Sequence, residues 1–108
     1  MSTLWLDDIR QPWKHGFMGA DWVKTADECI EALKTGQYTF ASLDHDLSEE
    51  ATMGRPKENE KTGYTVVCWL EANPQYWPVD GCRVHSMNPV GRDRMLRVIR
   101  AHYGHNFL

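Results

Sequence analysis

The sequence lacks the features that mark several common classes of protein. Its three cysteines (Cys29, Cys68 and Cys82) include no CxxC pair, which argues against a disulfide framework and against a structural zinc site. No apolar run approaches the roughly 18 residues that a membrane-spanning helix needs, and the first residues lack the basic and apolar regions of a signal peptide. We therefore expect buried, reduced thiols, no membrane partner and a cytoplasmic location.

Positive charge is scarce over most of the chain. Residues 1–81 contain seven Lys or Arg against fourteen Asp or Glu, whereas residues 82–108 contain five Arg against one Asp, and the net charge is −3. Without a long basic face, binding to duplex DNA is not expected. The acidic part could bind a metal and the arginine-rich end could bind a phosphate. Alternatively, the arginines form the solvated face of an ordinary helix.

The residues that are present fit one domain, which we expect to span residues 1–108. Hydrophobic residues make up 42% of the chain and charged residues 25%, which is enough apolar surface for a core. Apolar or β-rich runs at 4–6, 38–43 and 82–86 predict strands, and 22–24 predicts a short edge strand.

Helix signals separate these strands. Helix starts are predicted at Thr25, Thr62 and Asn88, and helix ends at Gly36, Asn73 and Gly104. Strand–helix alternation predicts a three-layer, flavodoxin-like α/β domain with about four parallel strands, helices on both faces, and a fifth strand that is short or absent. The polar residues 48–61 predict a surface loop that is either a lid or simply solvated.

Polar residues lie at the carboxyl end of each of the three clear strands. They are Asp7-Asp8, Asp44-His45-Asp46 and His85-Ser86. Parallel sheets bind ligands beyond the carboxyl ends of their strands, so we expect a site there. Carboxylates gathered at one point repel one another unless a cation neutralises them. Asp7, Asp8 and Asp44 are therefore candidate ligands of Mg²⁺ or Mn²⁺, although single members could instead cap a loop or helix.

The two strand-end histidines are candidates for proton transfer near neutral pH, or for binding a transition metal. We expect His85 to act as the general acid or base, with His45 or Asp46 as its partner. Asp44 is a further catalytic candidate, and a covalent aspartyl-phosphate on it is a variant of the same hypothesis. The other histidines, His15, His102 and His105, are expected at the surface.

A phosphate site is predicted where the last strand leads into a helix. Free backbone N–H groups and the helix dipole favour an anion there. Ser86 can donate its hydroxyl, Asn88 lies at the helix start, and Arg92 can reach a phosphate oxygen from the first turn. Alternatively, Asn88 caps the helix and nothing binds.

The pattern resembles the receiver domains of bacterial response regulators. Asp7-Asp8 match the acidic pair after the first strand, Asp44 matches the phosphorylated aspartate, and Ser86 matches the small hydroxyl residue. The lysine that receivers place after a fifth strand is missing from the last residues. That difference puts the usual phosphorylation switch in doubt.

A narrower resemblance covers the chain from start to end. Leu4–Arg10 (LWLDDIR), Leu43–Leu47 (LDHDL), Thr62–Tyr64 (TGY) and His85–Arg92 (HSMNPVGR) are similar to the cyclic-phosphate-processing receiver-like family. This resemblance implies a receiver-like scaffold that acts as a phosphoesterase on cyclic phosphates derived from nucleotides, RNA ends or ADP-ribose. Arg10, in the first of these motifs, joins Ser86, Asn88 and Arg92 as a candidate for binding the substrate.

Two hypotheses of function follow. The first is a metal-assisted cyclic phosphodiesterase that uses His and Asp acid–base chemistry. The second is a non-catalytic module, either an atypical receiver or a binder of cyclic nucleotides in which Trp5, Trp13, Trp22 or Tyr64 stacks on a base. Metal-dependent turnover separates the two. The sequence leaves the oligomeric state open.

Overall fold

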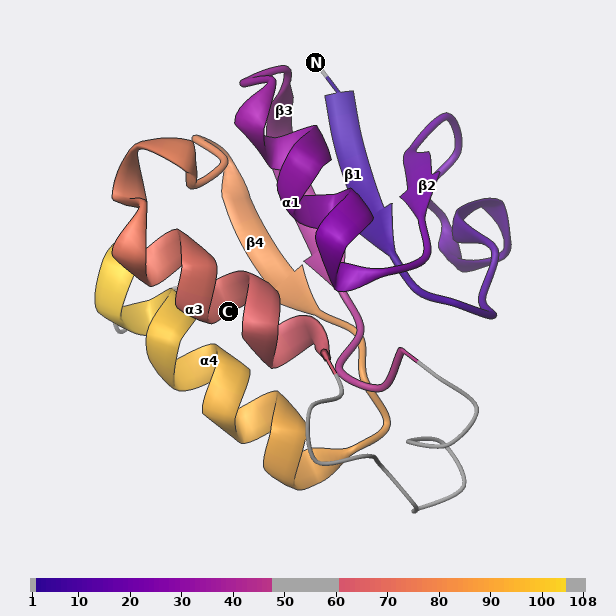
Figure 1. Cartoon of the computed structure of the whole chain (residues 1–108). Helices are drawn as coiled ribbons and strands as arrows, with labels where there is room; N and C mark the ends of the chain where they lie inside the picture. Colours follow the sequence, from indigo (N-terminus) through magenta and orange to yellow (C-terminus); the bar gives the residue numbers. More distant parts are fainter. Residues whose placement is uncertain (1, 48–60, 105–108) are drawn as a thin grey trace.

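A parallel β-sheet forms the centre of the protein (Figure 1), which we analysed in a computed structural model that describes residues 2–47 and 61–104. In these residues the sheet has four parallel strands in the order β2-β1-β3-β4. Their bounds are β1 Ser2–Leu6, β2 Asp21–Val23, β3 Tyr38–Leu43 and β4 Gly81–Val84. All the predicted strands are present, but β2 and β4 begin one residue earlier than expected and β4 ends at Val84.

The register of the sheet brings the polar strand ends to one level. Leu6 of β1 pairs with Leu43 of β3, which pairs in turn with Val84 of β4. The ladder continues for one more residue, because the Asp44 amide donates to the Leu6 carbonyl at 2.9 Å and the His85 amide donates to the Leu43 carbonyl at 3.0 Å. The backbone therefore sets Asp44 and His85 side by side at the carboxyl edge of the sheet.

Three α-helices of the described residues cover one face of the sheet (Figure 1). They are α1 (Ala26–Lys34), α3 (Gly63–Ala72) and α4 (Pro89–Tyr103). Each begins at the residue that the sequence predicts: Thr25 and Thr62 form capping boxes, and the Asn88 side chain accepts the Gly91 amide at 3.0 Å. Alternate strand residues point into the core between the sheet and these helices. They are Leu4, Leu6, Ala41, Leu43, Cys82 and Val84.

The opposite face is covered differently from the prediction. The segment between β1 and β2, including the 3₁₀ helix η1 (Pro12–His15), packs on it with the ring of Phe17. Phe17 lies 5.1 Å from the ring centroid of Trp5 and 6.4 Å from that of Phe40. The expectation of α-helices on both faces is thus corrected for the described residues, since a proline and two glycines in this short connection favour turns over a regular helix.

The remaining predictions concern single segments. The three cysteines are free; Cys29 and Cys82 are buried as expected, whereas Cys68 is only half-buried. His15 and His102 are exposed as predicted, and each stacks on a tryptophan. The predicted loop of residues 48–61, apart from its last residue, and His105 lie outside the described residues.

No helix in the described ranges is both long and apolar enough to cross a membrane.

Candidate functional site

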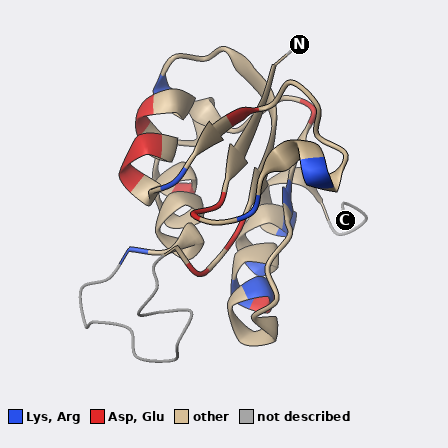
Figure 2. Cartoon of the chain, turned by 90° about the vertical axis from the view of Figure 1, so that its right-hand side faces the viewer, with Lys and Arg blue, Asp and Glu red and all other residues tan. Residues whose placement is uncertain are grey.

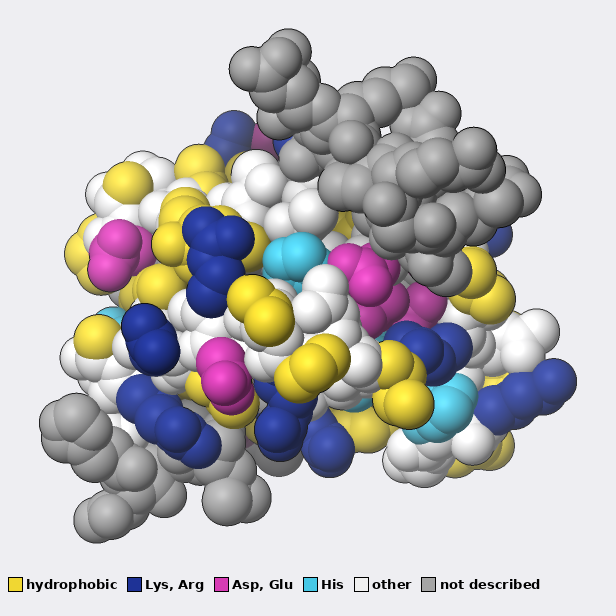
Figure 3. Space-filling model, turned by 90° about the horizontal axis from the view of Figure 1, so that it is seen from below, with side chains coloured by type: hydrophobic (Ala, Val, Ile, Leu, Met, Phe, Trp, Pro, Cys, Tyr) yellow, Lys and Arg dark blue, Asp and Glu magenta, His cyan; other side chains and the backbone are white. Residues whose placement is uncertain are grey.

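A pocket lies at the carboxyl edge of the sheet, where the sequence predicts a ligand site. Its lining combines four carboxylates and one arginine with two apolar side chains, namely Asp7, Asp8, Ile9, Arg10, Asp44, Asp46 and Met87. Figure 2 shows acidic positions gathered in the loops at this end of the strands, with basic positions along α4. Seen from below, acidic side chains lie beside a histidine in the middle of this face, with hydrophobic side chains nearby (Figure 3).

Asp7 is held by its own loop. One carboxylate oxygen, Oδ1, accepts the backbone amides of Ile9 and Arg10, both at 2.9 Å, and the side chain is 1% exposed. The indole of Trp22 donates to the Asp7 carbonyl. Burial favours the protonated acid, but the hydrogen bonds from His85 and the two amides outweigh it and lower the Asp7 pKa to about 2. Asp7 is therefore a fixed, ionised carboxylate.

The pKa of Asp44 is shifted in the opposite direction from that of Asp7. Burial and the neighbouring charge of Asp7 raise its pKa to about 6, although Arg10, the His45 amide and the Ser86 hydroxyl stabilise the ionised form. The His45 amide donates to its Oδ1 at 2.9 Å. Its raised pKa therefore lies closer to the pH range in which general acids and bases work.

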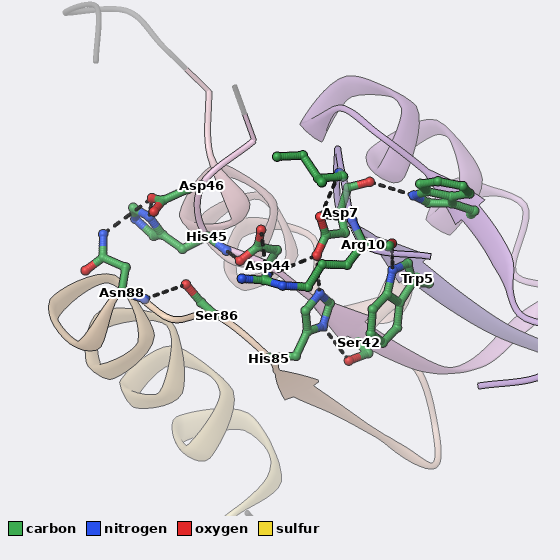
Figure 4. A network of polar contacts seen from close by, with 12 residues as sticks. Trp5, Asp7, Arg10, Ser42, Asp44, His45, Asp46, His85, Ser86 and Asn88 are labelled. Atoms are coloured by element: carbon green, nitrogen blue, oxygen red, sulfur yellow. Dashed lines mark hydrogen bonds and ion pairs between the residues drawn. The ribbon is translucent and has the colours of Figure 1, made fainter. Parts of the chain in front are cut away.

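Arg10 lies between these two carboxylates (Figure 4). Its Nη1 is 3.2 Å from Oδ2 of Asp7 and 3.5 Å from Oδ2 of Asp44. The cation that neutralises the two aspartates in this structure is thus a side chain of the same chain. Arg10 also lines the pocket, as expected of a residue that contacts an anionic ligand.

His85 is fixed by three contacts beneath the pocket. Its Nε2 lies 3.1 Å from Oδ2 of Asp7, its Nδ1 lies 2.7 Å from the hydroxyl of Ser42, and its ring stacks on Trp5 with centroids 3.9 Å apart (Figure 4). Burial lowers the pKa of His85 against the opposing effect of Asp7. The arrangement fits a neutral ring that receives a hydrogen bond from Ser42 and donates one to Asp7.

His45 belongs to a separate pair. Its Nδ1 lies 2.7 Å from Oδ1 of Asp46, which also accepts the side-chain amide of Asn88 at 3.3 Å. Gly91 packs so closely on the imidazole that a Cβ there would lie 2.5 Å from ring carbons. The expected partnership of His85 with His45 or Asp46 is thus replaced by two pairs, because strand register brings His85 to Asp7 while Asp46 follows His45 in the chain.

The phosphate candidates differ in position. Ser86 hydrogen bonds to Asp44 and accepts the Asn88 amide at 3.1 Å, so it lies within the network. Asn88 caps α4 and also contacts Asp46. Arg92 is exposed on the first turn of α4, and the pocket lining contains Met87 rather than Arg92.

The carboxylate oxygens at the pocket suit a hard divalent cation, but Arg10 already contacts them. One ligand atom each of Asp7, Asp44 and His85 lies within 4.8 Å of the others, so His85 joins this cluster where the sequence analysis expected Asp8. Asp8 instead lines the pocket, half-buried, with its pKa raised by burial and by Asp7. Carboxylate oxygens suit Mg²⁺ or Mn²⁺, but the Arg10 guanidinium now contacts the same two carboxylates.

Comparison with known protein families identifies the scaffold. The model of the cyclic-phosphate processing receiver domain matches residues 2–101. The chain belongs to this family. No curated protein and no solved structure matches the chain. The four parallel strands and the helices described above agree with the receiver-like fold that the sequence motifs imply.

Within this receiver-like frame, sequence reasoning missed two contacts. Ser42, which is 0% exposed, holds the His85 ring, and its only sequence signal is a hydroxyl in an otherwise apolar strand end. Trp5 was considered as a base-stacking residue, but it is 1% exposed and stacks on His85 instead. Ile9 and Met87, exposed by 63% and 82%, are the apolar residues that flank the pocket.

Proposed function

We propose that this member of the cyclic-phosphate processing receiver family is a hydrolase that opens a cyclic phosphate ester at the Asp7–Arg10–Asp44 pocket. The observation that carries the proposal is the opposite tuning of two adjacent buried carboxyls, since Asp7 stays ionised while the pKa of Asp44 is raised to about 6. Two neighbouring carboxyls whose pKa values are driven apart are characteristic of acid–base active sites.

In the reaction, water attacks phosphorus, one ring P–O bond breaks, and the leaving oxygen takes a proton. Asp44, protonated, is placed to donate that proton. The His45–Asp46 pair is the candidate base for the water, because the two side chains are hydrogen bonded at 2.7 Å and Asp46 lines the pocket. Ser86 and Arg10 hold the phosphoryl oxygens, where their hydrogen bonds stabilise the developing charge.

His85 acts through Asp7. Both of its ring nitrogens have partners in the protein, so its task is to orient Asp7 and keep it ionised. A Mg²⁺ or Mn²⁺ ion, when bound to the Asp7 and Asp44 carboxylates, would keep Asp44 ionised and would supply Lewis-acid stabilisation in place of its proton. A cytoplasmic location and a nucleotide, RNA-end or ADP-ribose substrate are part of the same proposal.

The test is a panel of cyclic phosphates followed by phosphorus NMR with Mg²⁺, with Mn²⁺ and with chelator. The panel contains nucleoside 2′,3′- and 3′,5′-cyclic phosphates and an ADP-ribose cyclic phosphate. We expect ring opening of one class by the wild type, and a loss of about 100-fold or more in both Asp44→Asn and His45→Gln, since general acid–base groups contribute that much. Asp93→Asn, an exposed change of equal charge on α4, is the matched control. Binding without turnover across the panel would favour the non-catalytic module.

A further inference from the structure

Arg10 is anchored at the pocket by its backbone, whereas its side chain is partly exposed. Its amide donates to Oδ1 of Asp7 at 2.9 Å, and its carbonyl accepts the indole N–H of Trp5 at 2.8 Å. These bonds hold the main chain at the pocket wall. The side chain is one-third exposed, whereas the carboxylates that it contacts are 1% and 6% exposed.

The contacts of Arg10 overlap the candidate metal ligands. Oδ2 of Asp7 is shared by Arg10 at 3.2 Å and His85 at 3.1 Å, and Oδ2 of Asp44 also faces Arg10 (Figure 4). A divalent ion bound at these buried oxygens would repel the positive guanidinium strongly, because little water screens the two charges. A divalent ion and the guanidinium therefore compete for the same two oxygens.

We propose that Arg10 and a divalent cation are alternative partners of the Asp7–Asp44 pair, and that metal binding releases the Arg10 side chain to bind phosphate. The proposal rests on the metal site included in the proposed function. Without metal, Arg10 neutralises the carboxylates and is unavailable to an anion. With metal, the guanidinium is free at a pocket that it already lines.

This exchange makes metal and phosphate bind cooperatively. A ligand that takes Arg10 away from the carboxylates favours the metal, and by thermodynamic linkage the metal favours that ligand to the same extent. The cooperativity depends on a positive side chain at position 10. It is a property of binding and exists without turnover.

The first test is Mn²⁺ binding by titration calorimetry. Arg10→Gln removes the competing charge, so we expect its Mn²⁺ affinity to exceed that of the wild type by about tenfold, within the usual range of coupling between sites. Arg10→Lys keeps a competing charge and is expected to stay near the wild type. Arg97→Gln, an exposed residue more than two turns along α4, is the control of equal charge. Equal affinities in Arg10→Gln and Arg97→Gln overturn the proposal, as does a lack of Mn²⁺ binding by both.

The second test measures inorganic phosphate binding with and without Mg²⁺. We expect Mg²⁺ to raise phosphate affinity more in the wild type than in Arg10→Gln, because only the wild type gains a freed guanidinium. Equal enhancement in both proteins contradicts the exchange. These titrations need no turnover. The exchange proposal can therefore be wrong while cyclic phosphates are still hydrolysed in chelator, and it can be right even where no hydrolysis is observed.

Discussion

Asp7 and Asp44 show how neighbouring side chains of one type acquire different chemistry. Both are buried, but Asp7 accepts two backbone amides at 2.9 Å, whereas Asp44 faces the negative charge of Asp7. The first arrangement stabilises the carboxylate and the second destabilises it. The difference arises from His85, which hydrogen bonds to Asp7, and from the turn that follows β1, which aims two N–H groups at Asp7.

Because the pKa of Asp44 is raised, we expect the folded protein to be less stable at pH values at which Asp44 is ionised. The folded pKa is about 6 against 3.8 for the ordinary group, so between these values the folded state holds a proton that the unfolded state releases. Stability therefore falls as pH rises through this window, by at most about 3 kcal/mol. Asp44→Asn has no such charge, so its stability relative to the wild type should be greater at about pH 8 than at about pH 4.

Urea unfolding in chelator at the two pH values measures this difference. Asp93→Asn serves as the control, because its side chain is exposed and its effect on stability should be small at both values. A stability difference between Asp44→Asn and the wild type that does not change with pH would contradict the assigned electrostatics.

At the scale of the elements, two glycines place helices against the site. Gly63, in the first turn of α3, lies so close to the carbonyl of Asp44 that no Cβ fits between them. Gly91, in the first turn of α4, makes the corresponding close approach to the ring of His45. Both helices therefore start directly against the segment Asp44–His45 that follows β3.

The two glycines are expected to respond differently to alanine. In Gly63→Ala the new methyl group meets backbone, so we expect a loss of about 2–3 kcal/mol in the free energy of unfolding, despite the higher helix propensity of alanine. In Gly91→Ala it meets a side chain that can turn, so the stability loss should be smaller while the His45–Asp46 pair is displaced. Urea denaturation compares the two variants; a Gly63→Ala protein as stable as the wild type would refute the close packing.

Local signals predicted the elements better than their packing. The caps at Thr25, Thr62 and Asn88 are confirmed because each uses a hydrogen bond within one turn of the chain. The strand ends are off by one or two residues, since pairing with neighbouring strands decides where a strand ends. The face covered by η1 was predicted wrongly because contacts such as Phe17 with Phe40 join residues far apart in the sequence.

At the scale of the whole molecule, parallel topology accounts for the site. The sequence predicted that the polar strand ends would meet, and register confirms the meeting of Asp7, Asp44 and His85. It could not predict which groups pair, because the two histidine–carboxylate pairs depend on side-chain direction within that edge. Nor could it show that Arg10 contacts both aspartates, since that contact depends on the turn after β1.

The most direct test of the account is hydrolysis of the cyclic phosphate panel in ¹⁸O-labelled water, with the mass of the product measured by mass spectrometry. The account predicts a phosphate monoester that carries one ¹⁸O on phosphorus, formed by the wild type and by Asp93→Asn, and formed about 100-fold or more slowly by Asp44→Asn. Recovery of every cyclic phosphate intact and unlabelled, including those that bind, would contradict it and identify the pocket as a binding site without catalysis.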